Sequence, residues 1–411
     1  MERNERGRET GRWRMARAKN RPASGRHVAR AAEAGLAVGG KTVDAEGLFN
    51  RDGRAGGFLR TFRNRYLPAR GDVFVPGELV EKWRLRPGCK VKGQAVAGGT
   101  WAPHLRSVEA VNDLPPERHL EVIPFEERVS VDPDQKFDLG IEGDINLRVL
   151  DLLVPIGKGQ RALILAPPRS GKTVLLQKIA RTVRIHSGVE LLVLLVNERP
   201  EEVTEFRRAV GGEVVSSSLD DRVENHAMVA DMVLERGKRL AEIGKDVVLV
   251  VDSLTRLARA HNLTAELSGR TMSGGIDAKA LERPRRIFGA ARKLEGAGSL
   301  TIVATVLVDT GSRGDQVIYE EFKGTGNMEL ALCRELANLR IWPAVDIEKS
   351  GTRKEEKLLD VEDLRRVRAL RRVLSRAKKA EAMEVLIAKM STTKTNKEFL
   401  ELLDREMKSR R

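Results

Sequence analysis

The sequence predicts an α/β fold in which a small N-terminal β-barrel precedes a larger domain built on a mainly parallel sheet. Short apolar runs that alternate with Gly, Pro and Asp predict the barrel. Farther along, continuous apolar runs alternate with helical stretches, which is typical of parallel strands buried on both faces. A loop that contains Gly-Lys-Thr stands between one such strand and a helix, and it predicts a phosphate-binding site in the larger domain.

The domain boundaries follow shifts in composition. Residues 1–45 are rich in Arg and poor in large apolar side chains, so we expect a basic, disordered tail. Residues 46–117 form the predicted barrel, and residues 118–137, with several Pro and acidic residues, form a predicted linker. Residues 138–411 form the larger domain. The 411 residues are too many for one ordinary core, which agrees with two domains.

Charge and cysteine usage limit the class of function. Lys and Arg exceed Asp and Glu by 74 − 59 = 15, a surplus that favours a polyanionic partner but also fits a generally basic surface. Cys89 and Cys333 stand too far apart to build a disulfide framework or a zinc knuckle. The longest apolar runs, such as Leu191–Val196, are strand-sized and the N-terminus lacks a signal-like apolar region. We therefore expect no membrane association and a cytoplasmic location.

The individual elements are predicted from the same patterns. Barrel strands are expected at 57–62, 72–75, 90–97 and 107–112. Parallel strands are expected at 162–165, 191–196, 247–251 and 300–304, and helices at 173–185, 222–243 and 278–294. The last fifty residues carry Leu and Val among arginines and are predicted as basic amphipathic helix.

The loop at 166–173 reads Ala-Pro-Pro-Arg-Ser-Gly-Lys-Thr, with Ala where such loops usually begin with Gly. Its glycine allows a tight turn, its lysine can reach the β- and γ-phosphates, and its threonine can ligate Mg²⁺. The following helix directs the positive end of its dipole at the anion. The sequence therefore predicts ATP with Mg²⁺ as the ligand. The predicted nucleotide contacts from this loop are Pro168, Arg169, Ser170, Gly171, Lys172, Thr173 and Val174.

Two carboxylates are predicted at the same edge of the sheet. Asp252 ends an apolar strand, where it can help Thr173 to hold the Mg²⁺. Glu198 stands just beyond another apolar strand and can deprotonate the attacking water. Its neighbour Arg199 can contact phosphate. Asp252, Glu198 and Lys172 are thus candidate catalytic residues.

Seven segments together resemble the bacterial transcription termination factor Rho family. They span residues 155–161, 166–173, 198–204, 252–259, 288–292, 320–330 and 350–356. The resemblance covers the chain from about residue 46 to about residue 375. It implies a cold-shock-like OB-fold barrel that binds single-stranded RNA, followed by a RecA-like P-loop ATPase domain. It also implies a homohexameric ring that moves along nascent RNA with ATP hydrolysis, separates RNA from DNA, and acts on the RNA polymerase elongation complex.

The resemblance assigns roles to residues one by one. Glu198 matches the catalytic base, and Arg199 matches an arginine that links the nucleotide to the subunit boundary. Arg340 and Arg353 match arginine fingers supplied across the interface, where a guanidinium stabilises charge on the transferring phosphoryl group. Trp342 matches the aromatic side chain on which adenine stacks.

RNA contacts are implied in the barrel and in two loops. The barrel candidates are Phe58, Arg60 and Phe74, since such barrels stack bases on aromatics beside basic groups. The loops at 268–275 and 311–315 resemble the contacts of a central channel. The residues implied there are Arg270, Ser273, Gly274, Gly275 and Arg313. The chain departs from the family at Gly56, where an aromatic is usual, and at Asn197, where Asp is usual.

Three alternatives stay open on sequence alone. A rotary-ATPase-type catalytic subunit also joins a β-barrel to a similar core, but the strong basicity disfavours it. A recombination-type DNA ATPase is disfavoured by the N-terminal barrel. A nonenzymatic RNA-binding protein with a degenerate ATP site is disfavoured by the intact set of Lys172, Thr173, Glu198 and Asp252.

Overall fold

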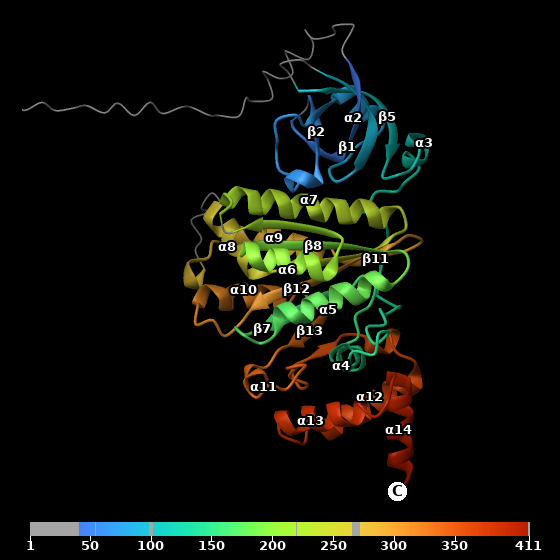
Figure 1. Cartoon of the computed structure of the whole chain (residues 1–411), viewed down its shortest axis with the longest axis vertical. Coiled ribbons are helices and arrows are strands. Elements are labelled where there is room, and N and C mark those ends of the chain that lie inside the picture. Colours follow the sequence, from blue (N-terminus) through green and yellow to red (C-terminus); the bar gives the residue numbers. More distant parts are fainter. Residues whose placement is uncertain (1–40, 54, 98–101, 219, 265–271, 410–411) are drawn as a thin grey trace, which may run out of the picture.

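The computed structural model describes residues 41–53, 55–97, 102–218, 220–264 and 272–409. A closed barrel lies at one end of the molecule, an α/β domain occupies the middle, and three helices lie at the other end (Figure 1). The arrangement confirms the predicted fold class. Most of the predicted tail lies outside the described residues.

The barrel has five strands in the closed order β1-β2-β3-β5-β4. They are β1 (Thr42–Arg51), β2 (Gly56–Arg60), β3 (Val73–Pro76), β4 (Lys90–Val96) and β5 (His104–Val111). β1 pairs with both β2 and β4, and this double pairing closes the barrel. Alternate residues of each strand point inward, and Phe49, Val75 and Val91 are fully buried in its small core. β1 was not predicted, and it begins inside the range expected for the tail.

Short helical segments accompany the barrel and the chain that leaves it. They are η1 (Phe62–Asn64), α2 (Gly77–Lys82) and α3 (Pro116–His119), followed by the two-residue strand β6 (Ser130–Val131). The range predicted as a linker is packed against the core, since Phe125 and Phe137 are each 1% exposed. The backbone N–H of Phe125 donates to the Glu242 carboxylate at 2.6 Å. The barrel is therefore joined to the larger domain by a fixed segment.

The larger domain is built on a mainly parallel sheet, as predicted. Its strands lie in the order β14-β13-β7-β12-β10-β8-β9. Its parallel strands are β7 (Arg161–Ala166), β8 (Val189–Glu198), β9 (Glu213–Ser218), β10 (Asp246–Asp252), β12 (Ser299–Leu307) and β13 (Met328–Ala331). β14 (Gly351–Thr352) and β11 (Arg292–Leu294) add antiparallel pairs at the margins. The four predicted parallel strands are all present, each slightly longer than expected.

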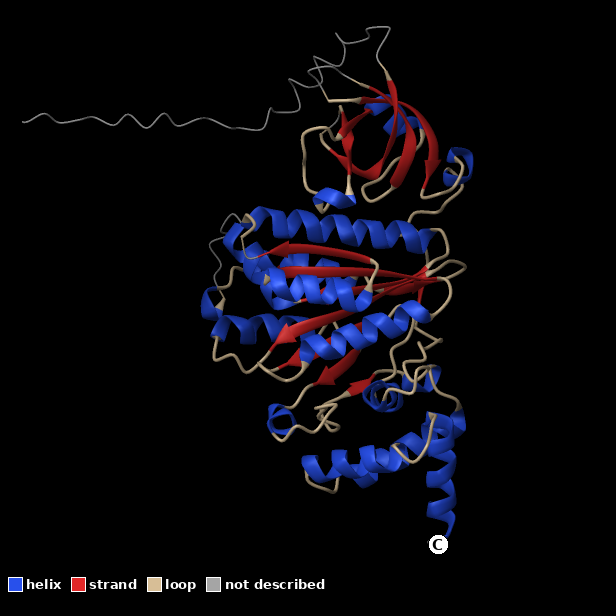
Figure 2. Cartoon of the chain, viewed as in Figure 1, coloured by secondary structure: helices blue, strands red, loops and turns tan. Residues whose placement is uncertain are grey.

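Helices cover both faces of this sheet (Figure 2). They are α4 (Ile145–Leu153), α5 (Lys172–Ile185), α6 (Pro200–Val210), α7 (Val223–Glu242), α8 (Leu254–Thr264), α9 (Glu282–Gly289), α10 (Arg313–Lys323) and α11 (Arg334–Asn338). Successive residues of β8 serve opposite faces: Leu191 and Val193 join the core under α5 and α6, whereas Leu192 and Leu194 join the core under α7 and α8. This double burial explains the unbroken apolar run in the sequence.

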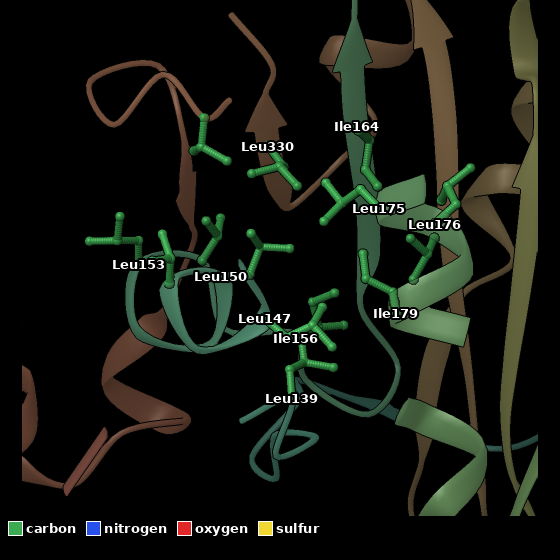
Figure 3. Packing of buried hydrophobic residues seen from close by; sticks show 14 of the residues in the cluster. Leu139, Leu147, Leu150, Leu153, Ile156, Ile164, Leu175, Leu176, Ile179 and Leu330 are labelled. Atoms are coloured by element: carbon green, nitrogen blue, oxygen red, sulfur yellow. The ribbon is translucent and has the colours of Figure 1, made fainter. Parts of the chain in front are cut away.

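The first of these cores also receives α4. Leu147 and Leu150 of α4 point toward Leu175 of α5, Ile164 of β7 and Leu330 of β13 (Figure 3). Three of these elements, α4, β7 and α5, follow one another in the chain, and β13 comes from a distant part of the sequence. Their packing fixes α5, and with it the loop that precedes α5, against the sheet.

The helix predicted at 278–294 is wrong in its second half. Residues 278–281 form a 3₁₀ turn, η3 (Ala278–Leu281), and α9 ends at Gly289. Residues Arg292–Leu294 are the strand β11, which pairs with β12 and β6. Backbone pairing with two strands thus overrides the local helical pattern.

The last fifty residues form three helices: α12 (Val361–Leu374), α13 (Lys379–Met390) and α14 (Asn396–Ser409). Met383, Leu386 and Phe399 of these helices are buried in the core that α4 shares. None of the helices in the described ranges is long and apolar enough to cross a membrane.

Candidate nucleotide and RNA sites

The Gly-Lys-Thr loop joins the carboxyl end of β7 to the start of α5. Arg169 and Gly171 have φ of 63° and 79°, so the backbone turns through the left-handed region twice. Trp342 covers the loop, and a Cβ added at Gly171 would lie 2.4 Å from its ring. The Ser170 hydroxyl is buried and has no hydrogen-bond partner among the described residues. The loop therefore requires glycine and offers an unused polar group where the sequence places a phosphate.

Lys172 and Asp252 form the central ion pair of this site. The lysine Nζ lies 2.6 Å from both carboxylate oxygens of Asp252. The hydroxyl of Thr305, on the neighbouring strand β12, donates to Asp252 Oδ1 at 2.7 Å. Lys172 Nζ is also 3.7 Å from Glu198. The ends of three parallel strands thus bring together the lysine and both predicted carboxylates, as strand ends in open α/β sheets do.

Glu198 is held by a kink in its own strand. Asn197 has a φ of 54°, and the pairing of β8 with β9 shifts register between Val196 and Glu198. The kink turns the Glu198 carboxylate into the site, where the residue is 2% exposed. Burial raises the pKa of Glu198 above its ordinary range, although the Arg256 guanidinium opposes the shift. A carboxylate with a raised pKa beside a phosphate site can accept a proton from water.

Arg256 also lies in this site, although it was not among the residues predicted from the sequence. It forms an ion pair with Glu198 and donates to the Asn197 carbonyl at 2.9 Å. It lies near the start of α8, the helix that follows Asp252 in the chain, and its place in the same segment as Asp252 could have marked it. Arg256 therefore holds both the kink and the carboxylate that the kink directs.

The remaining nucleotide candidates divide between two places. Arg340 is exposed with a φ of 61° and stands two residues before Trp342, near the loop of its own chain. Arg199 is exposed at the start of α6. Arg353 lies at the opposite edge of the sheet, where its backbone N–H donates to Asn327. There it lines a cavity of about 180 Å³ with Arg161, the first residue of β7. The length of β7 thus separates Arg353 from the Gly-Lys-Thr loop.

The barrel candidates form one aromatic row. Phe58 and Phe74 meet edge to face with ring centroids 5.4 Å apart, and Arg60 lies 5.0 Å over the Phe58 ring. Arg60 also pairs with Asp72. His104 extends the row, with its ring centroid 5.4 Å from that of Phe74, although no sequence pattern singled it out. The row spans β2, β3 and β5, so its rings come together only when the barrel closes.

The departure at Gly56 has a structural cause. Gly56 has a φ of 143°, and a Cβ there would lie 2.2 Å from the Val75 carbonyl oxygen. An aromatic side chain at this position would require a different backbone path between β2 and β3. The family's additional ring is therefore not accommodated by the backbone seen here.

The two predicted channel loops contact each other. A Cβ at Gly274 would lie 2.7 Å from the Arg313 carbonyl carbon and 2.5 Å from the Gly314 nitrogen. Asp315 accepts hydrogen bonds from Arg259 of α8 and from Thr310, which ties the second loop to the helix that carries Arg256. Ser273 and Gly275 are exposed beside them. Arg270 lies outside the described residues.

Comparisons with known proteins agree with both halves of the chain. The Rho termination factor RNA-binding domain matches residues 46–117, and the ATP synthase alpha/beta family nucleotide-binding domain matches residues 146–352. Transcription termination factor Rho of Cereibacter sphaeroides is 47% identical over 91% of this chain and 89% of its own length. The Rho factors of Aquifex aeolicus and Escherichia coli are 49% and 47% identical, each over 85% of this chain and over 82% and 85% of their own lengths.

Solved structures show the fold at lower similarity. An ATPase from the type III secretion system of pathogenic bacteria superposes with a TM-score of 0.59 at 22% identity, over 75% of this chain and 93% of its own. An ATP synthase subunit of Nanoarchaeum equitans superposes with a TM-score of 0.56 at 17% identity, over 67% and 76%. The identity to the Rho factors, the RNA-binding domain and the nucleotide-binding domain together establish that the chain belongs to the transcription termination factor Rho family.

Proposed function

We propose that the protein is an RNA-dependent ATPase that terminates transcription by binding nascent RNA and moving along it. The observation that carries the proposal is the presence, on one chain, of a Rho-type RNA-binding barrel and a complete P-loop site. Movement along RNA, separation of RNA from DNA and action on the RNA polymerase elongation complex follow from membership of the family. We expect the protein to act in the cytoplasm, where bacterial transcripts are made.

In the proposed reaction, Lys172 exchanges its contact with Asp252 for the β- and γ-phosphates of ATP. Glu198 then accepts the proton of the attacking water. Arg256 keeps that carboxylate aimed at the water through its contacts with Glu198 and Asn197. Trp342, which already covers the loop, supplies a face on which adenine stacks.

A magnesium ion fits the oxygen donors of this site. Mg²⁺ prefers one or two protein oxygens together with phosphate and water, and the Thr173 hydroxyl and the Asp252 carboxylate are donors of that kind. When bound, it neutralises charge that develops on the phosphates. Thr305 orients Asp252 for this role through its hydrogen bond.

The proposed homohexamer completes the site from a neighbouring chain. Because β7 separates Arg353 from the loop of its own chain, Arg353 can act only on the ATP of a neighbour. A guanidinium donated in this way makes hydrolysis depend on subunit contact. Arg340 and Arg199 lie nearer the chain's own loop, at the proposed boundary between subunits. RNA in the ring would contact Ser273, Gly274, Gly275 and Arg313, with Arg270 beside them.

One assay distinguishes this function from the alternatives. ATP turnover is measured with poly(C), poly(U), single-stranded DNA and no polymer, with Lys172→Ala as the blank. RNA should raise turnover well above the level without polymer. Equal turnover without polymer would indicate a rotary-type ATPase, and equal stimulation by DNA would indicate a recombination-type one. RNA binding without any turnover would indicate a nonenzymatic protein.

A further inference from the structure

Two consecutive residues of the barrel hold strained backbone conformations and bind the ATPase domain. Arg65 and Tyr66 follow η1 and have φ of 55° and 60°, a region that costs roughly 1 kcal/mol or more for a residue other than glycine. Arg65 makes a two-pronged ion pair with Asp221, with its second nitrogen 2.9 Å from Oδ1. The Tyr66 hydroxyl donates to Glu213 at 2.6 Å. Contacts with the other domain thus maintain a turn that the barrel alone would not favour.

These contacts reach the strand that pairs with the catalytic strand. Asp221 also accepts from the backbone N–H of Ser218, the last residue of β9, at 2.7 Å. Ser218 is the pairing partner of Glu198 across the register shift in β8. A continuous set of contacts therefore runs from Arg65 through Asp221 and Ser218 to the kink that aims Glu198.

The barrel end of this path lies next to the aromatic row. Arg65 is five residues beyond Arg60, the last residue of β2, and only the short turn η1 separates them. Phe62 of that turn packs against Tyr66, with the two ring centroids 6.0 Å apart. Arg65 thus stands between the face on which bases would stack and the edge of the catalytic sheet.

We propose that Arg65 and Asp221 are positioning residues for ATP hydrolysis, which set the place of Glu198 through Ser218. The proposal rests on the proposed function, because it concerns the residue that activates water. Neither residue touches the nucleotide site. Loss of the pair lets the end of β9 relax and changes the aim of the base, while the phosphate-binding loop keeps its structure.

A second contact between the domains supplies a matched control. Arg86 of the barrel makes a two-pronged ion pair with Glu242 at 2.7 and 2.8 Å, in the same geometry as the first pair. Glu242 lies at the end of α7, away from β9 and from the pairing partner of Glu198. Removal of Arg86 weakens the docking of the barrel without interrupting the path through Ser218.

The test compares Arg65→Ala, Asp221→Asn, Arg65→Lys and Arg86→Ala in the full chain at saturating single-stranded RNA. Turnover number, KM for ATP, RNA affinity and thermal unfolding are measured for each. Arg65→Ala and Asp221→Asn should lower kcat by up to about 10²-fold, the scale of a catalytic group displaced by about 1 Å, with unchanged KM and RNA affinity. Arg65→Lys, which keeps one charged contact, should recover part of the loss. Arg86→Ala should lower the unfolding temperature and leave kcat unchanged.

Three results would overturn this proposal alone, and a fourth would overturn the proposed function as well. Unchanged kcat in Arg65→Ala and Asp221→Asn would show that these contacts do not position Glu198. An equal loss of kcat in Arg86→Ala would attribute the effect to docking in general. A loss of RNA affinity that saturating RNA reverses would place Arg65 in the RNA site instead. An unsubstituted chain without RNA-stimulated turnover would overturn the proposed function itself, and the positioning role with it.

Discussion

The Lys172 ammonium lies at equal distances, 2.6 Å, from the two carboxylate oxygens of Asp252. Both side chains are largely buried, so each depends on the other for a counter-charge. Lys172, which is proposed to bind phosphate, and Asp252, which is proposed to bind the metal ion, are therefore paired with each other in this structure. Removal of Lys172 takes the ion-pair partner from the buried Asp252 carboxylate.

Substitution of Lys172 by Ala should abolish ATP turnover, because the loop then loses the ammonium group that neutralises the β- and γ-phosphates. Lys178→Ala is the matched control, since Lys178 lies on the same helix and pairs with Asp144 outside the site. It should retain turnover. Substantial turnover in Lys172→Ala, measured by phosphate release, would refute the assignment of the loop.

Glu198→Gln should bind ATP but hydrolyse it roughly 10²–10⁴-fold more slowly, the usual contribution of a general base. A fluorescent nucleotide can report binding, and single-turnover hydrolysis can report the chemical step. A variant that no longer binds ATP would mean that Glu198 maintains the structure of the site.

The pH dependence of hydrolysis should reflect the raised pKa of Glu198. Burial raises the pKa of Glu198, and the base works only when deprotonated. kcat should therefore fall as pH decreases through a value above the ordinary range of a glutamate, which is about 4.3. The control is the RNA affinity at each pH. A kcat that stays constant down to the ordinary range would contradict a buried Glu198 as the base.

Trp342→Ala should raise the KM for ATP, since one lost base-stacking contact typically costs about 1–3 kcal/mol. Trp342→Phe keeps an aromatic face and should show a smaller effect. A KM that is the same in both variants and in the unsubstituted chain would remove Trp342 from the adenine site.

Arg353→Ala should be inactive alone but should support hydrolysis in mixed rings, where a neighbour that keeps Arg353 donates it to a site on the variant subunit. Turnover is measured across a series of mixing ratios, with Lys172→Ala as the second component. Two inactive variants that restore activity to each other would demonstrate donation between subunits. Mixtures without any recovered activity would count against it.

The sequence predicted those parts of the site that are defined by residues adjacent to one another in the chain. The Gly-Lys-Thr loop and Asp252 can each be recognised from the apolar strand that precedes them in the sequence. The structure brings them together. Arg256 could not be assigned with the same ease, because its partners Glu198 and Asn197 lie on β8 and no local pattern indicates that it contacts them. Arg65 and Asp221 are 156 residues apart, and neither has a local pattern that names its partner.

The fold was predicted less well where polar residues interrupt a strand. β1 carries the exposed Asp44 and Glu46 and the half-buried Gly47 among its residues, so its buried residues did not stand out as an apolar run. β11 followed a helical pattern, and only its pairing with β12 and β6 makes it a strand. Such pairings are set by tertiary structure, which a local pattern does not contain.

RNA on the barrel and RNA at the channel loops should act differently on ATP hydrolysis. The most direct measurement compares RNA affinity and RNA-stimulated turnover in Phe58→Ala and Arg313→Ala, side by side at one salt concentration. Phe58→Ala should weaken RNA binding by about 1–3 kcal/mol, and saturating RNA should restore its turnover. Arg313→Ala should still bind RNA on the barrel, yet its turnover should stay low at any RNA concentration. If both variants lose affinity equally and both recover turnover at saturating RNA, the claim of two distinct RNA sites is wrong.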